Sequence, residues 1–239
     1  MTERWVSFIS GEGTTMEAGM ASVQNGEAGN LKAACVISSS YDAGGVRKAS
    51  DQIVPVRVVR REDFREESGK IDQEKYGKRL LRILREHEAT LVTLNGWEYL
   101  IPENVIKEYK GRIFNQHPGP VPEFGGKNMF GLRVHAARLN FVRAVGRDFW
   151  TEAVIQRVDK KVDEGAVVKS KRIEILPDDT PESLQKRVLP VEHKLFVAFL
   201  KDFVSGNIQD VERESLVHPG EEHILFKAKE DAIKAYPIV

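Results

Sequence analysis

The chain has one cysteine, no net charge and no long apolar run. Cys35 cannot form a disulfide within the chain, and its apolar neighbours at 33–37 predict a buried, small hydrophobic residue. The 36 Lys and Arg residues balance 36 Asp and Glu residues, so no overall field attracts nucleic acid or an anionic membrane. The apolar runs are far shorter than the roughly 20 residues that span a bilayer. Residues 1–9 lack the features of a signal peptide, and we expect a cytoplasmic protein.

Several catalytic and metal-binding signatures are also missing. The six histidines show no zinc-type spacing with the cysteine, so a structural metal is not expected. Neither a G-x-S-x-G nor a Walker motif occurs. The 239 residues, 41% of them apolar, suit one large α/β domain followed by a tail.

The first distinctive feature is a strand, a glycine turn and a helix near the start. Residues 4–10 predict the strand, Gly11-x-Gly13 the turn, and Thr14 opens the helix. Backbone N–H groups and the positive helix end converge there, which favours an anion. A dinucleotide site is excluded, because Met16 replaces the third glycine of G-x-G-x-x-G. A mononucleotide-type phosphate site and a glycine turn without a ligand both remain open.

The central segment, 114–126, joins an amide and an imidazole to a run of prolines and glycines. The residues before it predict the end of a buried strand, and three alternate prolines force the chain out of the sheet as a stiff loop. Asn115 and His117, two residues apart, then face the same side at the strand's carboxyl end. This pair suits a reaction in which a carbonyl oxygen becomes negative while a proton moves. A turn-capping Asn beside a half-buried His is the alternative.

The remaining pattern predicts an α/β fold with a doubly wound, mostly parallel twisted sheet flanked by helices. Residues 151–158 and 167–176 predict an antiparallel hairpin, whose acidic turn contains Asp163. Composition alone does not distinguish that turn from solvated surface. Residues 141–150 are predicted only as a connection.

A long helix is predicted from 181 to 205, interrupted at Glu192 and His193. Residues 207–239 are predicted to form a weakly patterned tail. We therefore expect a catalytic domain at 1–205 and a C-terminal extension at 206–239 packed on the same domain.

A loop after the fourth predicted strand, at 90–94, is rich in apolar and aromatic residues. It carries Trp97, Tyr99, Leu100 and Ile101. These side chains suit either the core or a slot for a flat heteroaromatic ligand.

Four motifs occur in a characteristic order. Ser10-Gly11-Glu12-Gly13-Thr14 is similar to Ser-Gly-x-Gly-Ser, and Asn115-Gln116-His117-Pro118 to Asn-Ile-His-Pro. Val162-Asp163-Glu164-Gly165 is similar to a Leu-Asp-Gly-Gly or Asp-Glu-Gly turn, and Glu192-His193 to a Glu-His pair on a late helix. In this order they resemble the phosphoribosylglycinamide formyltransferase (glycinamide ribonucleotide transformylase) family, of which the chain looks like a divergent member.

The resemblance implies a Rossmann-like formyltransferase fold and an enzyme of purine biosynthesis. The reaction would transfer a formyl group from 10-formyltetrahydrofolate, a co-substrate, to the primary amine of glycinamide ribonucleotide. Asn115 would hold the formyl oxygen, His117 would orient the same centre and assist proton movement, and Asp163 would relay a proton through water. No metal is required, because the formyl group is already activated.

The resemblance also implies two binding regions. Residues expected to bind the acceptor substrate are Gly11, Gly13, Thr14, Thr15 and Glu192. Residues expected to line the folate slot are Trp97, Tyr99, Leu100, Ile101, Ile106 and Val162.

Departures from the family pattern leave the acceptor open. Thr15 stands in place of a common Asn, Gln156 in place of a common His, Leu189 in place of a polar residue and Tyr99 in place of a common Arg. The alternatives are formyl transfer to another small phosphorylated amine or amino-sugar nucleotide, and a non-catalytic folate- or nucleotide-binding homologue. Expected partners are small molecules, with no nucleic acid and no membrane, for a monomer or homodimer.

Overall fold

The computed structural model describes residues 2–237 of the chain. Residue 1, the first residue of the predicted catalytic domain, and residues 238–239, the last residues of the predicted extension, lie outside the described residues. Among the described residues, seven strands form one sheet in the order β3-β2-β1-β4-β5-β6-β7. The strands β1 to β5 run parallel and β6 and β7 are antiparallel, which confirms the predicted mostly parallel sheet with a hairpin.

The chain forms two compact units. Unit 1 comprises the residues up to 116 together with 157–160 and 196–208, and unit 2 comprises the rest. The prediction of a catalytic domain at 1–205 with an extension at 206–239 stays a prediction.

Unit 1 is built on parallel strands. These are β1 (Glu3–Ile9), β2 (Leu31–Ser38), β3 (Val56–Val58), β4 (Leu91–Leu94) and β5 (Ile113–His117), whose last residue belongs to unit 2. β1 pairs with both β2 and β4, so it lies at the centre of this part of the sheet. Its successive residues Val6 and Ser7, which face opposite sides of the sheet, are both buried, as expected for parallel strands covered on both faces.

Helices connect these strands. They are α1 (Thr14–Gln24), α2 (Gly44–Asp51), α3 (Gln73–Glu86) and α4 (Glu103–Glu108), with a 3-10 turn, η1 (Arg61–Phe64), before α3. α3 begins after Asp72, whose carboxylate accepts a hydrogen bond from the Lys75 amide at 2.9 Å. Its apolar stripe packs against the core of the parallel strands.

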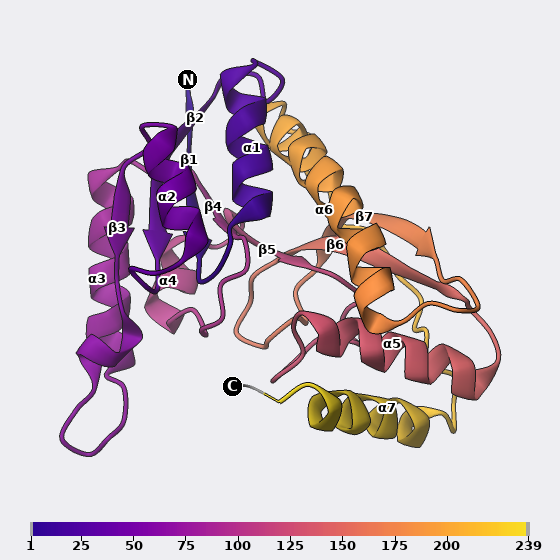
Figure 1. Cartoon of the computed structure of the whole chain (residues 1–239). Coiled ribbons are helices and arrows are strands. Elements are labelled where there is room, and N and C mark those ends of the chain that lie inside the picture. Colours follow the sequence, from indigo (N-terminus) through magenta and orange to yellow (C-terminus); the bar gives the residue numbers. More distant parts are fainter. Residues whose placement is uncertain (1, 238–239) are drawn as a thin grey trace. The chain divides into compact units, whose positions relative to one another are not determined.

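Unit 2 contains α5 (Leu132–Val145), β7 (Val167–Glu174) and α7 (Glu222–Ala235). It also contains β6 (Trp150–Arg157) except its last residue, and the first part of α6 (Pro181–Val204). β6 and β7 form the predicted antiparallel hairpin. α5 and α7 lie side by side (Figure 1) and share an apolar core with Phe124. Ala228 and Ala232 of α7 are buried there, and their small side chains allow close packing.

The prediction of a weakly patterned tail at 207–239 was wrong, because α7 is a helix of 14 residues. Its packed face combines the buried Ala228 and Ala232 with the partly buried Ile224, Leu225 and Ile233, which follow a helical spacing. An isolated helix of this length is only marginally stable in water, so the packing against α5 stabilises it.

Two further predictions need correction. Residues 141–150 are not merely a connection, since α5 continues to Val145 and ends at Gly146, which has a left-handed φ of 70°. The helix α6 is not interrupted at Glu192 and His193 but runs unbroken through Pro190. Buried apolar residues on both sides of the proline, Val188 and Leu195, hold the helix together despite the local cost.

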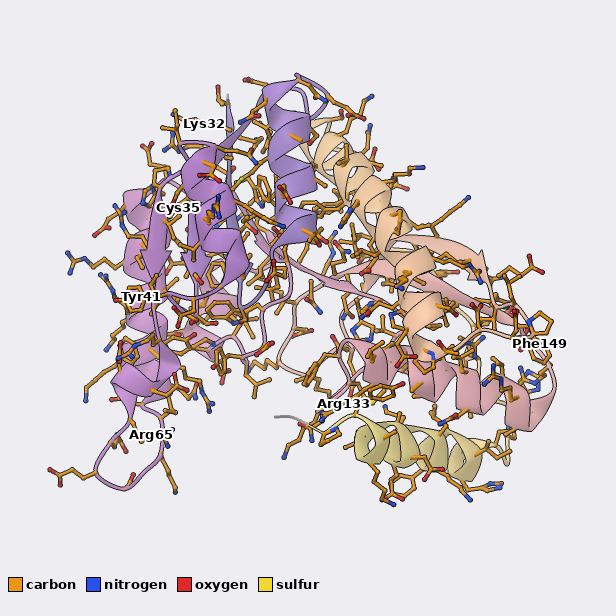
Figure 2. All side chains as sticks on the ribbon, in the orientation of Figure 1. Lys32, Cys35, Tyr41, Arg65, Arg133 and Phe149 are labelled. Carbon is orange, nitrogen blue, oxygen red and sulfur yellow. The ribbon has the colours of Figure 1, made fainter. Side chains whose placement is uncertain are left out.

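The prediction for Cys35 (labelled in Figure 2) is confirmed, because its side chain is buried in β2. Burial raises the pKa of this thiol to about 12, so it stays protonated and unreactive at neutral pH. Within residues 2–237, no helix has both the length and the hydropathy needed to cross a membrane.

Candidate functional site

His117 ends β5 and is buried in unit 2, with 3% of its surface exposed. Its Nε2 lies 3.1 Å from the carbonyl oxygen of Phe124, and its Nδ1 lies 3.8 Å from Oδ2 of Asp163. Because a carbonyl only accepts, Nε2 carries a hydrogen and donates it. Nδ1 is therefore the ring atom that gains or loses a proton, and it faces a carboxylate.

The surroundings of His117 determine its charge. Burial lowers the pKa of His117 below its usual range, although the nearby carboxylate of Asp163 and the hydrogen bond to Phe124 act in the opposite direction. The positive charge of Lys229 lowers this pKa further. The imidazole is therefore neutral at pH 7 and available to accept a proton.

Asp163, in the turn between β6 and β7, is held by two donors. The side-chain amide of Gln156 donates to Oδ1 at 2.7 Å, and the backbone amide of Gly126 donates to Oδ2 at 2.9 Å. Its side chain is 8% exposed. Both oxygens are thus fixed, which directs the carboxylate toward His117. The sequence shows Gln156 only as a departure from a common His, so its contact with Asp163 was missed.

Gly125 is required at its position by the close approach of Asp163. A Cβ at residue 125 would lie 2.4 Å from Cβ of Asp163, a separation that real Cβ atoms essentially never show. We expect Gly125→Ala to displace the carboxylate and to slow turnover by about a hundredfold, the typical cost of misplacing a reacting group by 1 Å. Steady-state kinetics and thermal unfolding measured together check this result.

Gly119→Ala is a matched control for this substitution. A Cβ there would lie 2.4 Å from Cγ1 of Val134, so the clash is equally close but does not involve Asp163. We expect this variant to lose stability and to retain more of its turnover than Gly125→Ala. An equal loss of turnover in the two variants would contradict the role assigned to the carboxylate.

His135 lies on α5 next to this pair, with 1% of its surface exposed. Neither ring nitrogen has a hydrogen-bond partner among the described residues. Burial, and secondarily the charge of His117, lowers the pKa of His135 to about 4. The ring is therefore an uncharged part of the packing beside His117.

The buried His135 predicts a pH dependence of stability. Between its unfolded pKa of about 6.5 and its folded pKa of about 4, the unfolded chain binds a proton that the folded chain does not. The free energy of unfolding should fall as pH decreases through this window, by about 1.4 kcal/mol for each pH unit. Urea unfolding at several pH values measures the slope, and His135→Leu should reduce it. An unchanged slope in that variant would show that another group is responsible.

The predicted phosphate loop belongs to unit 1, between β1 and α1. Gly13 caps α1 with a left-handed φ of 61°, and a Cβ there would lie 3.0 Å from Cα of Gly45, so both conformation and space favour glycine. Thr14 opens the helix, Gly11 is exposed, and Thr15 is buried. The predicted strand, turn and helix are thus present, while phosphate binding stays a prediction.

The residues predicted for the folate slot in unit 1 differ in exposure. The half-buried Trp97 packs edge-on against Phe8 with ring centroids 5.1 Å apart, and Ile101 and Ile106 belong to or pack against the same core. Tyr99 is half-buried beside Trp97, and Leu100 is 66% exposed. Trp97, Ile101 and Ile106 therefore have a packing role, and folate contact by the set stays a prediction.

Val162 and Glu192 belong to unit 2. Val162 is 40% exposed beside Asp163, and Glu192 is buried on α6. Their predicted roles in binding folate and the acceptor stay predictions. Among residues 2–237, no three His, Cys, Asp or Glu side chains gather in a way that could hold a metal ion.

Comparison with known proteins identifies the family of the chain. A family model described as formyl transferase matches residues 3–200. The chain is 30% identical over 190 residues to the chloroplastic phosphoribosylglycinamide formyltransferase of Arabidopsis thaliana, covering 80% of this chain and 61% of the relative. It is 28% identical to the phosphoribosylglycinamide formyltransferase of Dictyostelium discoideum, covering 84% of this chain and 98% of the relative.

A solved structure shows the same fold. The phosphoribosylglycinamide formyltransferase of Brucella melitensis is 29% identical, with a TM-score of 0.72 over 88% of this chain and 100% of that chain. The class defined by the fold is thus an α/β protein with a mostly parallel sheet. The chain belongs to the formyl transferase family.

Proposed function

We propose that this protein transfers a formyl group from 10-formyltetrahydrofolate to the primary amine of glycinamide ribonucleotide, a step of purine biosynthesis. The observation that carries the proposal is the buried pair of His117 Nδ1 and Asp163 Oδ2, 3.8 Å apart. His117 stands two residues after the amide side chain of Asn115, and the chain belongs to the formyl transferase family, whose compared relatives are phosphoribosylglycinamide formyltransferases.

The reaction begins when the uncharged amine attacks the formyl carbon and a C–N bond forms. The carbonyl oxygen becomes negative, and the Asn115 amide donates a hydrogen bond to it. Asn115 and His117 are alternate residues of β5, so their side chains leave the strand on the same side. His117 orients the same tetrahedral centre from its own position on the strand.

A proton must then move from the attacking nitrogen to the folate nitrogen that departs. Asp163 relays this proton through a water molecule, and Nδ1 of His117 accepts or returns a proton as the charge shifts. When the folate nitrogen has gained the proton, its bond to the formyl carbon breaks, and the products are the formylated amide and tetrahydrofolate. The atoms and charges balance without a further reactant.

The first turn of α1 supports a phosphorylated acceptor. Its backbone N–H groups and the positive end of the helix follow the Gly11-x-Gly13 turn, and a helix N-terminus of this kind favours a phosphate group. The residues proposed to bind the acceptor are Gly11, Gly13, Thr14 and Thr15 of unit 1, for its phosphate, and Glu192 of unit 2, for its amine end. The residues proposed to bind folate include Tyr99 and Leu100 of unit 1 and Val162 of unit 2.

The alternative function is formyl transfer to a different acceptor, and three departures from the family pattern favour it. Thr15, Gln156 and Leu189 differ from the family pattern, and a different small phosphorylated amine or amino-sugar nucleotide would suit such a change. Three further expectations stay predictions. They are that the protein has no nucleic-acid or membrane partner, that it is a monomer or homodimer, and that it is cytoplasmic.

A spectroscopic assay tests the proposal. The purified protein is mixed with 10-formyltetrahydrofolate and each candidate amine, and the appearance of tetrahydrofolate is followed. We expect rapid release with glycinamide ribonucleotide and slower release with other phosphorylated amines. Release only with another amine would replace the acceptor, and folate binding without release under any condition would show a non-catalytic homologue.

A further inference from the structure

The helix α7 lies outside residues 3–200, which the family model matches, yet it contacts the segment that holds His117 and Asp163. The ammonium group of Lys229 donates to the carbonyl oxygen of Glu123 at 3.0 Å and to that of Gly125 at 2.7 Å. These two carbonyls flank the Phe124 carbonyl, which accepts from His117. The Lys229 side chain therefore binds the carbonyl groups on both sides of the Phe124 carbonyl, which accepts the hydrogen bond from His117.

The next residue extends this arrangement to the carboxylate. The Gly126 amide donates to Asp163 Oδ2 at 2.9 Å, so four successive residues, 123–126, connect α7, His117 and Asp163. Displacing the segment would move the partners of both groups together. The distance of 3.8 Å between Nδ1 and Oδ2 thus depends on where α7 holds residues 123–126.

Unit 2 fixes α7 at several other points. At its C-terminal end, the buried Arg133 of α5 (labelled in Figure 2) donates from Nε to the carbonyl oxygen of Tyr236 at 2.7 Å. Before α7 begins, the Leu216 amide donates to the Glu123 carboxylate at 3.1 Å, and Arg147 pairs with Glu221. Lys229 therefore extends from a firmly packed helix rather than from a loose tail.

We propose that α7 positions the reacting groups, with Lys229 as a positioning residue that fixes residues 123–126; this inference rests on the function proposed above. The ammonium group contributes in two ways. Its hydrogen bonds set the path of the backbone around Phe124 and Gly126. Its positive charge also acts on His117 and Asp163 from a half-buried location where solvent screens it weakly.

The charge of Lys229 acts on the pKa of His117, and this pKa is a readout that distinguishes a positioning role from a loss of stability. The groups that act on the His117 pKa are the Asp163 carboxylate, the Phe124 carbonyl and Lys229, and the neutral His135 lies beside them. Lys229 lowers the pKa of His117, so removing its charge should raise that pKa. The pKa of Lys229 itself is lowered by burial, against the charges of Asp163 and Glu123.

Lys229→Met removes the charge and both hydrogen bonds and keeps the apolar stem. We expect kcat to fall about tenfold or more, because His117 and Asp163 are misplaced. KM should change little, because Lys229 does not bind the substrates. The His117 pKa, measured by NMR titration of the imidazole without substrate, should rise. Lys229→Arg keeps the charge and the donors and should restore both values toward those of the unchanged protein.

Lys227→Met is the matched control, because Lys227 is exposed on the same helix. It should leave kcat and the His117 pKa unchanged. If Lys229→Met does not fold, as thermal unfolding would show, Lys229→Gln serves as the same test with the charge removed and a donor kept. An unchanged kcat and His117 pKa in the neutral variant, or equal effects of Met and Arg, would overturn the proposal.

Different experiments overturn the formyl transfer activity and the positioning role of Lys229. A full-length, unchanged protein that forms no tetrahydrofolate with any amine would remove the proposed function. The NMR titration uses no substrate, so it still decides whether Lys229 controls the proton affinity of His117.

Discussion

Replacing Asp163 by Asn should lower kcat by about two to four powers of ten, the usual contribution of a positioned acid or base. The substitution keeps the shape of the side chain and removes its negative charge, so the relay through water loses its proton acceptor. KM for the folate should change little, because Asp163 acts on the proton rather than on the pterin. Steady-state and single-turnover kinetics separate these parameters.

The structure also predicts a stability cost for Asp163→Asn. The carboxylate accepts from Gln156 at one oxygen and from Gly126 at the other, whereas an Asn side chain offers only one oxygen. One donor is left without its acceptor, which typically costs about 1–3 kcal/mol. Asp159→Asn, an exposed change near the same turn, is the matched control and should leave both rate and stability near those of the unchanged protein. Full turnover in Asp163→Asn would exclude the proposed proton relay.

Replacing Asn115 by Ala should lower kcat by about two to three powers of ten, as the loss of a single oxyanion donor does elsewhere. The amide acts on charge that develops only during the reaction, so kcat should fall more than substrate affinity. Asn115→Asp should lower kcat further than Asn115→Ala, because a carboxylate would repel the forming oxyanion. Turnover at several substrate concentrations gives the comparison.

The neighbouring Gln116 provides the control for Asn115. Successive residues of a strand face opposite sides, so Gln116 leaves β5 away from Asn115 and His117. Gln116→Ala should keep most of the turnover. If Asn115→Ala behaved like Gln116→Ala, the oxyanion would have another donor and the assignment would be wrong.

The exit from β5 was predictable from the sequence because proline acts locally. The prolines after His117 exclude both helix and ladder, and β5 indeed ends at His117. Gly13 was predictable for the same reason, since a turn between β1 and α1 needs its left-handed conformation. Local backbone chemistry therefore located the N-terminal turn and the end of β5.

The remaining features depend on contacts between distant residues. Asp163 has no local feature that separates it from solvated acids, and only the fold brings it to His117. Lys229 was missed because its hydrogen bonds to the carbonyl oxygens of Glu123 and Gly125 join residues more than a hundred positions apart in the chain. Gln156 was visible in the sequence, but its hydrogen bond to Asp163 arises from the turn between β6 and β7.

A crystal structure with a non-reactive 10-formyltetrahydrofolate analogue and a phosphorylated amine tests the central claim most directly. We expect the analogue's carbonyl oxygen within hydrogen-bond distance of the Asn115 amide, with His117 beside the same carbon and Asp163 one water molecule away. The phosphate should lie on the first turn of α1. A folate bound away from His117, or a carboxylate of Asp163 turned from the imidazole in that complex, would contradict the account.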